Sequence, residues 1–250
     1  MRKYVIISIL AAFLSLWWSC SKDGSVSPSS NDTGKGGSLA RFAIVGNFLY
    51  VLSDLDMKIY NITTPNNPQF VDRQYIGWQI ETLFAYDKNL FIGAGSGVYM
   101  YQIQGDGRII SKGFYQHFKA CDPVVADANY AYSTIRSGRD CRSGDSINEL
   151  QILDVSNINQ PKWVSTVKMT FPIGVGLDGD NLFVCDKEGL RILNVADRKN
   201  PIQRQYIKNI DAIDVIVLDK HLLIIGKEKL TQIDYKDINN PKIVSILNLN

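Results

Sequence analysis

The sequence predicts an all-β protein, a five-bladed β-propeller of four-stranded antiparallel blades. Three observations predict this fold class. A segment of about 40 residues recurs five times, each copy contains four short apolar runs separated by turn residues, and no segment after residue 20 has a sustained helical period. Repeats of this length with four strands each are typical of propeller blades.

The repeat can be followed directly in the sequence. The stretch NLFVCDKEGLRILNVADRKNP at 181–201 has counterparts in HLLIIGKEKLTQIDYKDINNP at 221–241 and NFLYVLSDLDMKIYNITTPNNP at 47–68. We align the five copies on the residue that opens each second apolar run, which gives Asn47, Asn89, Asn129, Asn181 and His221. The longest interval between copies contains an insertion, RSGRDCRSGDSIN at 136–148.

Each copy has the same order of elements. The first runs are FAIV at 42–45, TLFAY at 82–86, PVVA at 123–126, GVGL at 174–177 and DVIVL at 214–218. A polar turn leads to the second runs, FLYVL, NLFIG, YAYST, NLFVC and LLIIG. After another turn come the alternating third runs, MKIYNI, VYMYQI, LQILDV, LRILNV and LTQIDY, and then the fourth, QFVDRQY, IISKGFY, KWVSTV, IQRQYI and KIVSIL. Short runs rich in β-branched and aromatic residues between turns predict strands.

Proline marks the start of the fourth run. Four copies carry it at the same position, as Pro68, Pro161, Pro201 and Pro241. Proline cannot donate to a sheet ladder and is found at the first residue of edge strands, so the fourth strand is predicted to form the outer edge of each blade. The second copy differs, because the turn at 104–107 replaces the proline and Ile109 occupies its position.

Two other folds fit a series of short strands, namely a β-sandwich and an open β-solenoid. A four-strand unit that recurs five times favours radial closure instead, because closure protects the sheet edges. The chain begins its repeats on a first strand and ends on a fourth, so each repeat is predicted to be one whole blade, with the propeller spanning residues 38–250.

Two copies carry a recognisable theme: ELQILDVSNINQPKWV at 149–164 and LRILNVADRKNPIQ at 190–203. In both, alternating aliphatic residues are followed by Asp or Asn, Val, a small residue, a polar stretch and a final Pro. This theme resembles the LVIVD-repeat family, predicted propellers of bacterial extracytoplasmic proteins. The resemblance covers 38–250. It implies the fold and an extracytoplasmic location, and it implies little about activity.

The first twenty residues predict export. MRK is followed by the uncharged run YVIISILAAFLSLWW and then by Ser19 and Cys20. A basic start, an apolar core and a small residue are typical of a secretory signal, here 1–19. The alternative, a membrane anchor helix, is disfavoured because the apolar run is shorter than the roughly 20 residues that cross a bilayer.

The end of this segment, LSLWWSC, resembles the lipobox of bacterial lipoproteins, although Trp17 and Trp18 replace the usual smaller residues. The resemblance implies that Cys20 becomes the lipidated first residue of the mature protein. SKDGS at 21–25 looks like the tract that follows this cysteine in surface-exported lipoproteins of some Gram-negative bacteria. The expected location is therefore the outer membrane, at the cell surface, with the lipid as the membrane contact.

Residues 20–37 are predicted to be a flexible, lipidated tether, because Ser, Gly, Asn and Asp dominate them and cannot offset ordering entropy by burial. The whole chain has 27 basic and 25 acidic side chains, and removal of Arg2 and Lys3 with the signal balances them. A neutral domain without a cluster of Lys and Arg has no electrostatic footprint for nucleic acid, so no nucleic-acid partner is expected.

The sequence offers no catalytic constellation. There is no Gly-x-Ser-x-Gly elbow and no His-Glu-x-x-His, and the two histidines, His117 and His221, are far apart. We therefore predict no catalytic residue, no cofactor and no metal. The acidic pairs Asp54/Asp56 and Asp186/Glu188 fall in turns between second and third strands, where aspartate is favoured by turn chemistry. The alternative, calcium ligation, is disfavoured because neither loop is rich in oxygen ligands.

One face of the predicted propeller carries a candidate ligand surface. Loops that enter successive blades hold Trp78, His117, Phe118 and Phe171, and the insertion on the same face holds Arg139. Aromatic side chains at a channel mouth could bind a glycan or a peptide. The alternative, which we favour because large apolar residues are usually buried, is that the apolar residues of these loops pack as core between the blades.

The remaining cysteines also map to this face. Cys121 precedes the third blade and Cys141 lies in its insertion, so the two are predicted to form a disulfide in the oxidising compartment that export implies. Cys185, at the end of a second strand, is interpreted as a small buried residue. The alternative is a zinc site made of His117 and the three cysteines, which lacks the short Cys-x-x-Cys spacing of structural zinc.

These observations favour a binding or scaffolding module on the cell surface, with a protein or glycan as its partner. The alternative is an enzyme or accessory subunit that acts on an extracellular polymer such as a glycan, which the aromatic face and the basic insertion leave open. A structural envelope protein that holds other proteins is a third hypothesis. The sequence leaves the ligand and the oligomeric state open.

Overall fold

The structure of the protein is a computed structural model that describes residues 36–117, 123–136 and 147–249. These residues form twenty β-strands in five four-stranded antiparallel sheets, each made of consecutive strands. The predicted fold class, a five-bladed propeller, is confirmed. Within the described ranges, no helix is long and apolar enough to cross a membrane.

The sheets are numbered as blades 1 to 5. Blade 1 contains β1 (Phe42–Val45), β2 (Phe48–Leu52), β3 (Asp56–Asn61) and β4 (Gln69–Tyr75). Blade 2 contains β5 (Ile80–Tyr86), β6 (Asn89–Ala94), β7 (Gly97–Ile103) and β8 (Ile109–Gln116). Blade 3 contains β9 (Val124–Ala126), β10 (Tyr130–Arg136), β11 (Asn148–Asp154) and β12 (Lys162–Lys168). Blade 4 contains β13 (Val175–Asp178), β14 (Asn181–Asp186), β15 (Gly189–Asn194) and β16 (Ile202–Lys208). Blade 5 contains β17 (Asp214–Val217), β18 (His221–Ile225), β19 (Lys229–Asp234) and β20 (Lys242–Asn248).

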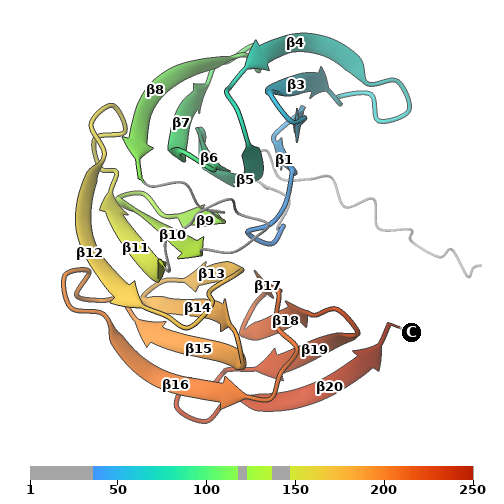
Figure 1. Ribbon diagram of the computed structural model, residues 1–250. Coiled ribbons are helices and arrows are strands. Elements are labelled where there is room, and N and C mark those ends of the chain that lie inside the picture. Colours follow the sequence, from blue (N-terminus) through green and yellow to red (C-terminus); the bar gives the residue numbers. More distant parts are fainter. Residues whose placement is uncertain (1–35, 118–122, 137–146, 250) are drawn as a thin grey trace, which may run out of the picture.

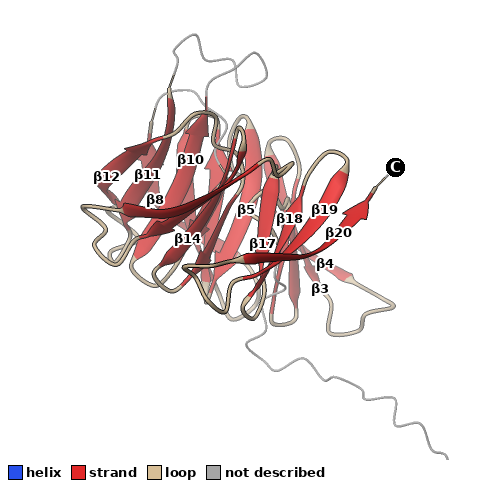
Figure 2. Cartoon of the chain, turned by 90° about the horizontal axis from the view of Figure 1, so that it is seen from below, coloured by secondary structure: helices blue, strands red, loops and turns tan. Residues whose placement is uncertain are grey.

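The blades follow one another around a central axis, with the first strand of each at the hub and the fourth strand outermost (Figure 1). Seen from the side, the strands run between two faces of the disc (Figure 2). We call the upper face the one where second strands connect to third strands and each blade connects to the next. The lower face carries the turns between first and second strands and between third and fourth strands.

The strand pairing corrects the predicted alignment of the repeats in two copies. Val45 pairs with Phe48 and Tyr130 pairs with Asp154, so β2 begins at Phe48 and β10 at Tyr130. Asn47 and Asn129 lie in the preceding turns. The structural register is therefore Phe48, Asn89, Tyr130, Asn181 and His221. The prediction was one residue out in these copies because asparagine is favoured in turns as well as at the strand starts of the other copies.

The Asp or Asn at the end of the third strand, in the motif shared by the repeats, has a clear structural role. Asp154, Asn194 and Asp234 each accept a hydrogen bond from the N–H two residues further on, at 2.8–2.9 Å. This local bond turns the chain out of the strand and toward the proline that starts the fourth strand. Every blade also has a register shift between its third and fourth strands, which bends the outer edge in the same way five times.

The apolar core consists of four clusters, one at each seam between consecutive blades. In each cluster, alternate residues of one blade pack against the first two strands of the next. At the seam between blades 4 and 5, for example, Phe183 and Cys185 face Leu222 and Ile224, and all four are fully buried. The inner strands pack in the order β1, β5, β9, β13 and β17.

The fifth seam, between blade 5 and blade 1, is made differently. No comparable packing joins β17 to β1 in the described part of the chain. Instead, the segment that leads into β1 bridges the hub. Ser38 and Leu39 donate their backbone N–H groups to the carboxylate of Asp214 in blade 5, at 3.2 and 3.0 Å, and Ala40 accepts a hydrogen bond from the N–H of Leu83 in blade 2. The radial closure predicted from the repeats is therefore not seen between the sheets of blades 5 and 1 in the described chain, and this segment links the two sides only at the centre.

Candidate functional site

Blades 1 and 5 each present an apolar face that no other described blade covers, and we call these two faces together the open sector. Figure 1 shows β4 and β20 at the two ends of the arc, with no sheet drawn between them. The apolar residues of the sector face of blade 1 are Phe42, Ile44, Leu49, Val51, Tyr60 and Phe70, and Lys58 and Arg73 lie on the same face on the outer strands β3 and β4. The apolar residues of the sector face of blade 5 are Ile216, Leu223, Ile225, Leu230 and Leu247, and Gln232 and Ser245 lie on the same face.

The strand register identifies the equivalent residues in blades whose faces are covered by a neighbour. Phe42, which pairs with Val51, corresponds to Leu83 of blade 2, which pairs with Ile92. Leu83 is 2% exposed because blade 1 covers it, whereas Phe42 is 58% exposed. Leu49 and Val51 are half-buried, and their counterparts Leu90 and Ile92 are fully buried. On β1 and β2 the sector face of blade 1 therefore matches a buried blade face but is less buried, whereas on β3 it carries Lys58 where blade 2 has Tyr99.

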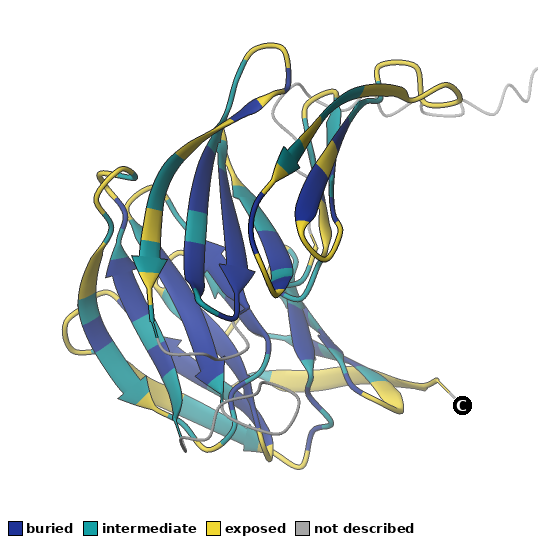
Figure 3. Ribbon diagram, turned by 45° about the horizontal axis from the view of Figure 1, so that its top comes forward, coloured by how far each residue is buried: buried dark blue, intermediate teal, exposed yellow. Residues whose placement is uncertain are grey.

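Blade 5 shows the same relationship on its opposite side. Leu223 and Ile225 correspond to Phe183 and Cys185 of blade 4, which are fully buried against blade 5. Leu223 and Ile225 themselves are only half-buried. All seven residues of β20 are exposed, as Figure 3 shows, and no charged residue follows Lys242 through Leu249. An uncharged, exposed outer strand is what soluble sheet proteins ordinarily avoid.

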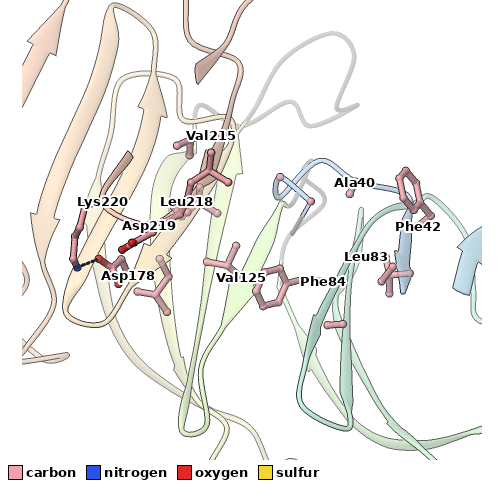
Figure 4. A pocket seen from close by; sticks show the side chains of 18 residues that line it. Ala40, Phe42, Leu83, Phe84, Val125, Asp178, Val215, Leu218, Asp219 and Lys220 are labelled. Carbon is pink, nitrogen blue, oxygen red and sulfur yellow. Dashed lines mark hydrogen bonds and ion pairs between the residues drawn. The ribbon is translucent and has the colours of Figure 1, made fainter. Parts of the chain in front are cut away.

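The hub encloses a cavity of about 320 Å³, lined mainly by the first strands of the blades (Figure 4). Most of the side chains that line it are apolar, and its lower end carries an ion pair in which Lys220 Nζ lies 2.8 Å from Asp178 Oδ2. The hydrogen bond and the charge of Asp178 raise the pKa of Lys220. The described lining contains no His, Cys, Ser or Thr, and its ionisable side chains are Asp178, Asp219 and Lys220.

The predicted ligand face on the upper side is assembled only in part. Trp78 is 72% exposed, so the interpretation of this residue as core is wrong, whereas Ile210 in the corresponding loop is buried as that interpretation predicts. Phe171 is half-buried beneath Arg136, whose Cζ lies 5.9 Å from the ring centroid. Trp78 and Phe171 make no ring contact with each other in the described chain. His117 is half-buried, while Phe118 and Arg139 lie outside the described residues.

The acidic turns act as structural elements. Asp186 accepts hydrogen bonds from the N–H groups of Thr170, Phe171 and Lys187 and pairs with Arg191 at 2.6 Å. Burial alone would raise the pKa of Asp186, but these bonds and the charge of Arg191 hold it below its usual value. Asp56 is bound by Arg73 in the corresponding turn of blade 1. Over the described ranges, no three His, Cys, Asp or Glu side chains gather as metal ligands would.

The cysteine predictions have different outcomes. Cys185 is fully buried between blades 4 and 5, as predicted, and burial together with the charge of Asp214 raises the pKa of its thiol. Cys121 and Cys141 lie outside the described residues, so their disulfide stays a prediction. Cys20, with the signal segment 1–19 and most of the tether, also lies outside them.

Two features were missed at the sequence level. The first is the hub contact of Asp214, which is signalled by a carboxylate at the start of an otherwise apolar first strand. Space for it depends on glycine, since a Cβ at Gly37 would lie 2.1 Å from Asp214 Oδ2 and one at Gly174 would lie 2.4 Å from Oδ1. The second is the open sector, which is signalled by the lack of charged residues after Lys242 in β20 and by Phe42 and Phe70 on the first and last strands of blade 1.

The comparisons with known proteins address the fold. The sequence matches no protein-family model and no curated protein. Among solved structures, it is similar to a functionally unknown protein from Desulfotomaculum acetoxidans, with a TM-score of 0.65 and 12% identity over 87% of this chain and 69% of that one. A protein from Lactobacillus plantarum matches with a TM-score of 0.63 and 11% identity over 80% of this chain and 67% of that one.

A third similar structure is apo AztD from Citrobacter koseri, with a TM-score of 0.55 and 11% identity. That match covers 79% of this chain and 58% of AztD. At such low identities the likeness establishes the shared propeller-like architecture alone, because one fold hosts many unrelated activities. The chain is thus a five-bladed β-propeller whose site has to be inferred from its own residues.

Proposed function

We propose that the protein is an exported, lipid-anchored binding propeller of the bacterial cell envelope, and that it binds a partner protein through the open sector. The resemblance of LSLWWSC to a lipobox and the polar tether at 20–37 support the anchored location. In this proposal Cys20 holds the domain at the outer membrane, on the cell surface, and the propeller acts as a scaffold rather than as a catalyst.

The observation that carries the proposal is the partial exposure of two blade faces whose first two strands have core composition. Contiguous apolar patches of this kind on soluble proteins mark interaction sites. The sector offers Phe42, Phe70 and Leu247 at 58%, 61% and 59% exposure. The hub cavity supports the proposal less well, because at about 320 Å³ and lined mainly by the first strands it offers no extended surface for a protein.

Site-specific photo-crosslinking in intact cells tests this function. A photoreactive residue is placed at Phe42 in one variant and at Leu223 in another, and the matched control carries it at Ile202. Ile202 is 67% exposed on the outer strand β16, away from the sector. We expect crosslinks to protein from positions 42 and 223 and none from 202. If neither sector position crosslinks to protein, or if all three do so equally, the proposed function is wrong.

A second candidate function, glycan binding at the upper face, is favoured by one observation. Trp78 stands 72% exposed in the loop between blades 1 and 2, and an exposed indole offers the flat apolar surface that sugar rings stack on. A glycan array with Trp78→Ala tests it, with Trp163→Ala as the control because Trp163 is also exposed, on β12. Loss of binding in the first variant alone supports the candidate, and turnover of a bound glycan would make the protein an enzyme.

A further inference from the structure

We infer that the occupant of the open sector is a blade-type antiparallel β-sheet presented by a partner protein, which completes the ring that this chain leaves open. This inference rests on the proposed function and names its class of partner. It is argued from the four complete seams of the same molecule, which show what covers a face of each kind.

Inside the ring, every covered blade face has the same kind of cover. At every complete seam, the cover of an apolar blade face is the apolar face of another four-stranded sheet. The seam between blades 1 and 2 buries Leu83, Leu90 and Ile92, three residues in adjacent strands β5 and β6. Their counterparts in blade 1 form a surface of the same width and pleat. A single amphipathic helix presents a narrow stripe and would leave part of such a face in water.

The two walls of the sector, the sector faces of blades 1 and 5, are not equivalent. The sector face of blade 5 corresponds to faces that, inside the ring, meet the next blade, since Leu223 corresponds to Phe183. The sector face of blade 1 corresponds to faces that meet the preceding blade, since Phe42 corresponds to Leu83. An occupant that satisfies both walls needs an apolar face on each of its two sides. One blade, or several consecutive blades, has this property.

Blades 5 and 1 are not free to pack directly against each other. The hub segment holds blades 1 and 5 at a fixed separation, because Ser38 and Leu39 are bonded to Asp214 while Ala40 is bonded to Leu83. Movement of β17 onto β1 would have to break these bonds, in which Ser38 and Asp214 are buried. The tether is no substitute for a blade, since 20–37 is polar throughout apart from Val26 and Pro28.

A second copy of this chain suits the sector less well than a separate sheet does. The two walls differ, so blade 1 of one copy would seat on blade 5 of another in a head-to-tail contact. Such contacts continue into open chains unless the rotation happens to close.

The test supplies a covering sheet in a defined form. A second copy of residues 169–248, which contain blades 4 and 5, is appended through a Gly-Ser linker to the C-terminus of the full mature chain. In the matched control, the appended copy carries Leu182→Lys and Val184→Lys on the face that would seat on blade 5. Oxidative footprinting by mass spectrometry reports the accessibility of Phe42 and Leu223, with buried Leu83 and Phe183 as internal references. Sedimentation velocity reports the oligomeric state.

We expect Phe42 and Leu223 to be oxidised in the unextended monomer. In the extended monomer their oxidation falls to the level of Leu83 and Phe183, and in the lysine control it does not. Unchanged oxidation in the extended protein overturns the blade-type occupant while leaving the proposed binding function intact. Protection of both residues in the unextended monomer overturns the inference and the proposed function together. Protection that appears only with dimer formation identifies a second copy as the occupant and also overturns the inference.

A second measurement keeps the inference testable if the extended chain does not fold. Crosslinks from positions 42 and 223 in intact cells are mapped to residues of the captured molecule. The inference requires that both positions reach one partner protein and that the crosslinked residues lie on opposite faces of antiparallel strands. Crosslinks to helical segments, or to this chain itself, would overturn it.

Discussion

Ser38 Oγ donates a 2.9 Å hydrogen bond to Asp214 Oδ1, and the same Oγ accepts one from the N–H of Val175 at 2.8 Å. One side chain next to the tether thus joins the first strand segment to blades 4 and 5 across the hub. The partners are 176 and 137 residues away in sequence. Because Ser38 is 1% exposed, water cannot replace either bond if the hydroxyl is removed.

Ser38→Ala is expected to lower the free energy of unfolding by about 1–3 kcal/mol, because the N–H of Val175 is left buried without a partner. Urea unfolding followed by tryptophan fluorescence measures the change. Ser245→Ala is the control, since Ser245 lies on the exposed strand β20 and bonds only to Gln232. Equal stabilities of the two variants would show that the hub bond contributes nothing.

Asp186→Ala is expected to lower the free energy of unfolding by about 3 kcal/mol at neutral pH, because Arg191 loses its buried partner and three backbone N–H groups lose their acceptor. The pKa of Asp186 is lowered in the fold, so the folded state binds fewer protons than the unfolded state near that pKa. The stabilisation that Asp186 provides is therefore complete above the ordinary aspartate pKa of about 4. It is lost as the pH falls through the pKa that Asp186 has in the folded protein.

Unfolding free energies of wild type and Asp186→Ala, measured from neutral pH down to the acid limit of folding, check this sign. The gap between the two proteins should narrow only in acid. Glu188→Ala in the same turn is the control, because Glu188 is exposed and should change stability by less than about 0.5 kcal/mol. A gap that widens in acid would refute the assigned role of Asp186.

Cys20→Ala tests the predicted anchor. A single residue carries the lipid in the proposed mature protein, so the variant should leave the membrane fraction and accumulate unprocessed or soluble. Intact mass spectrometry of the wild-type N-terminus should show a lipid at Cys20. Ser21→Ala serves as the control and should fractionate like the wild type. Retention of the Cys20→Ala protein with membranes would contradict the proposed anchor.

The predicted Cys121–Cys141 disulfide is tested by non-reducing peptide mapping of the exported protein. The described flanks of both segments lie at the same edge of blade 3, where the N–H of Thr134 donates to Pro123 at 3.1 Å and Arg136 pairs with Asn148. Closing a loop of about 20 residues should stabilise the domain by roughly 3 kcal/mol. Free thiols at both positions, or stoichiometric zinc in the purified protein, would refute the prediction.

The strands and the number of blades can be predicted from the sequence. Each blade is a local unit, and its turns and alternating apolar residues all lie within about 40 residues. The errors at Asn47 and Asn129 arise where one residue type suits two adjacent positions, and only the pairing of Val45 with Phe48 resolves them. The alternation also predicts correctly that Cys185 is buried. Local patterns are therefore informative wherever the covering element is the next repeat.

The site depends on relationships that local patterns do not contain. The exposed Phe42 and the buried Leu83 occupy equivalent positions, and both are ordinary strand residues in the sequence. Which of them meets a neighbour is decided by how blades 1 and 5 are held at the hub, through a contact between residues 38 and 214. Trp78 is a similar case, because loop residues of the same size pack or project according to tertiary context.

The most direct test of the open sector compares footprinting of Phe42 and Leu223 in the purified mature protein and in the protein on intact cells. Both residues should be oxidised far more than Leu83 and Phe183 after purification, and both should be protected on the cell, where the partner occupies the sector. Ile202 should be oxidised equally in both samples. Protection of Phe42 and Leu223 in the purified monomer, or equal oxidation in both samples, would contradict a partner-binding sector between blades 1 and 5.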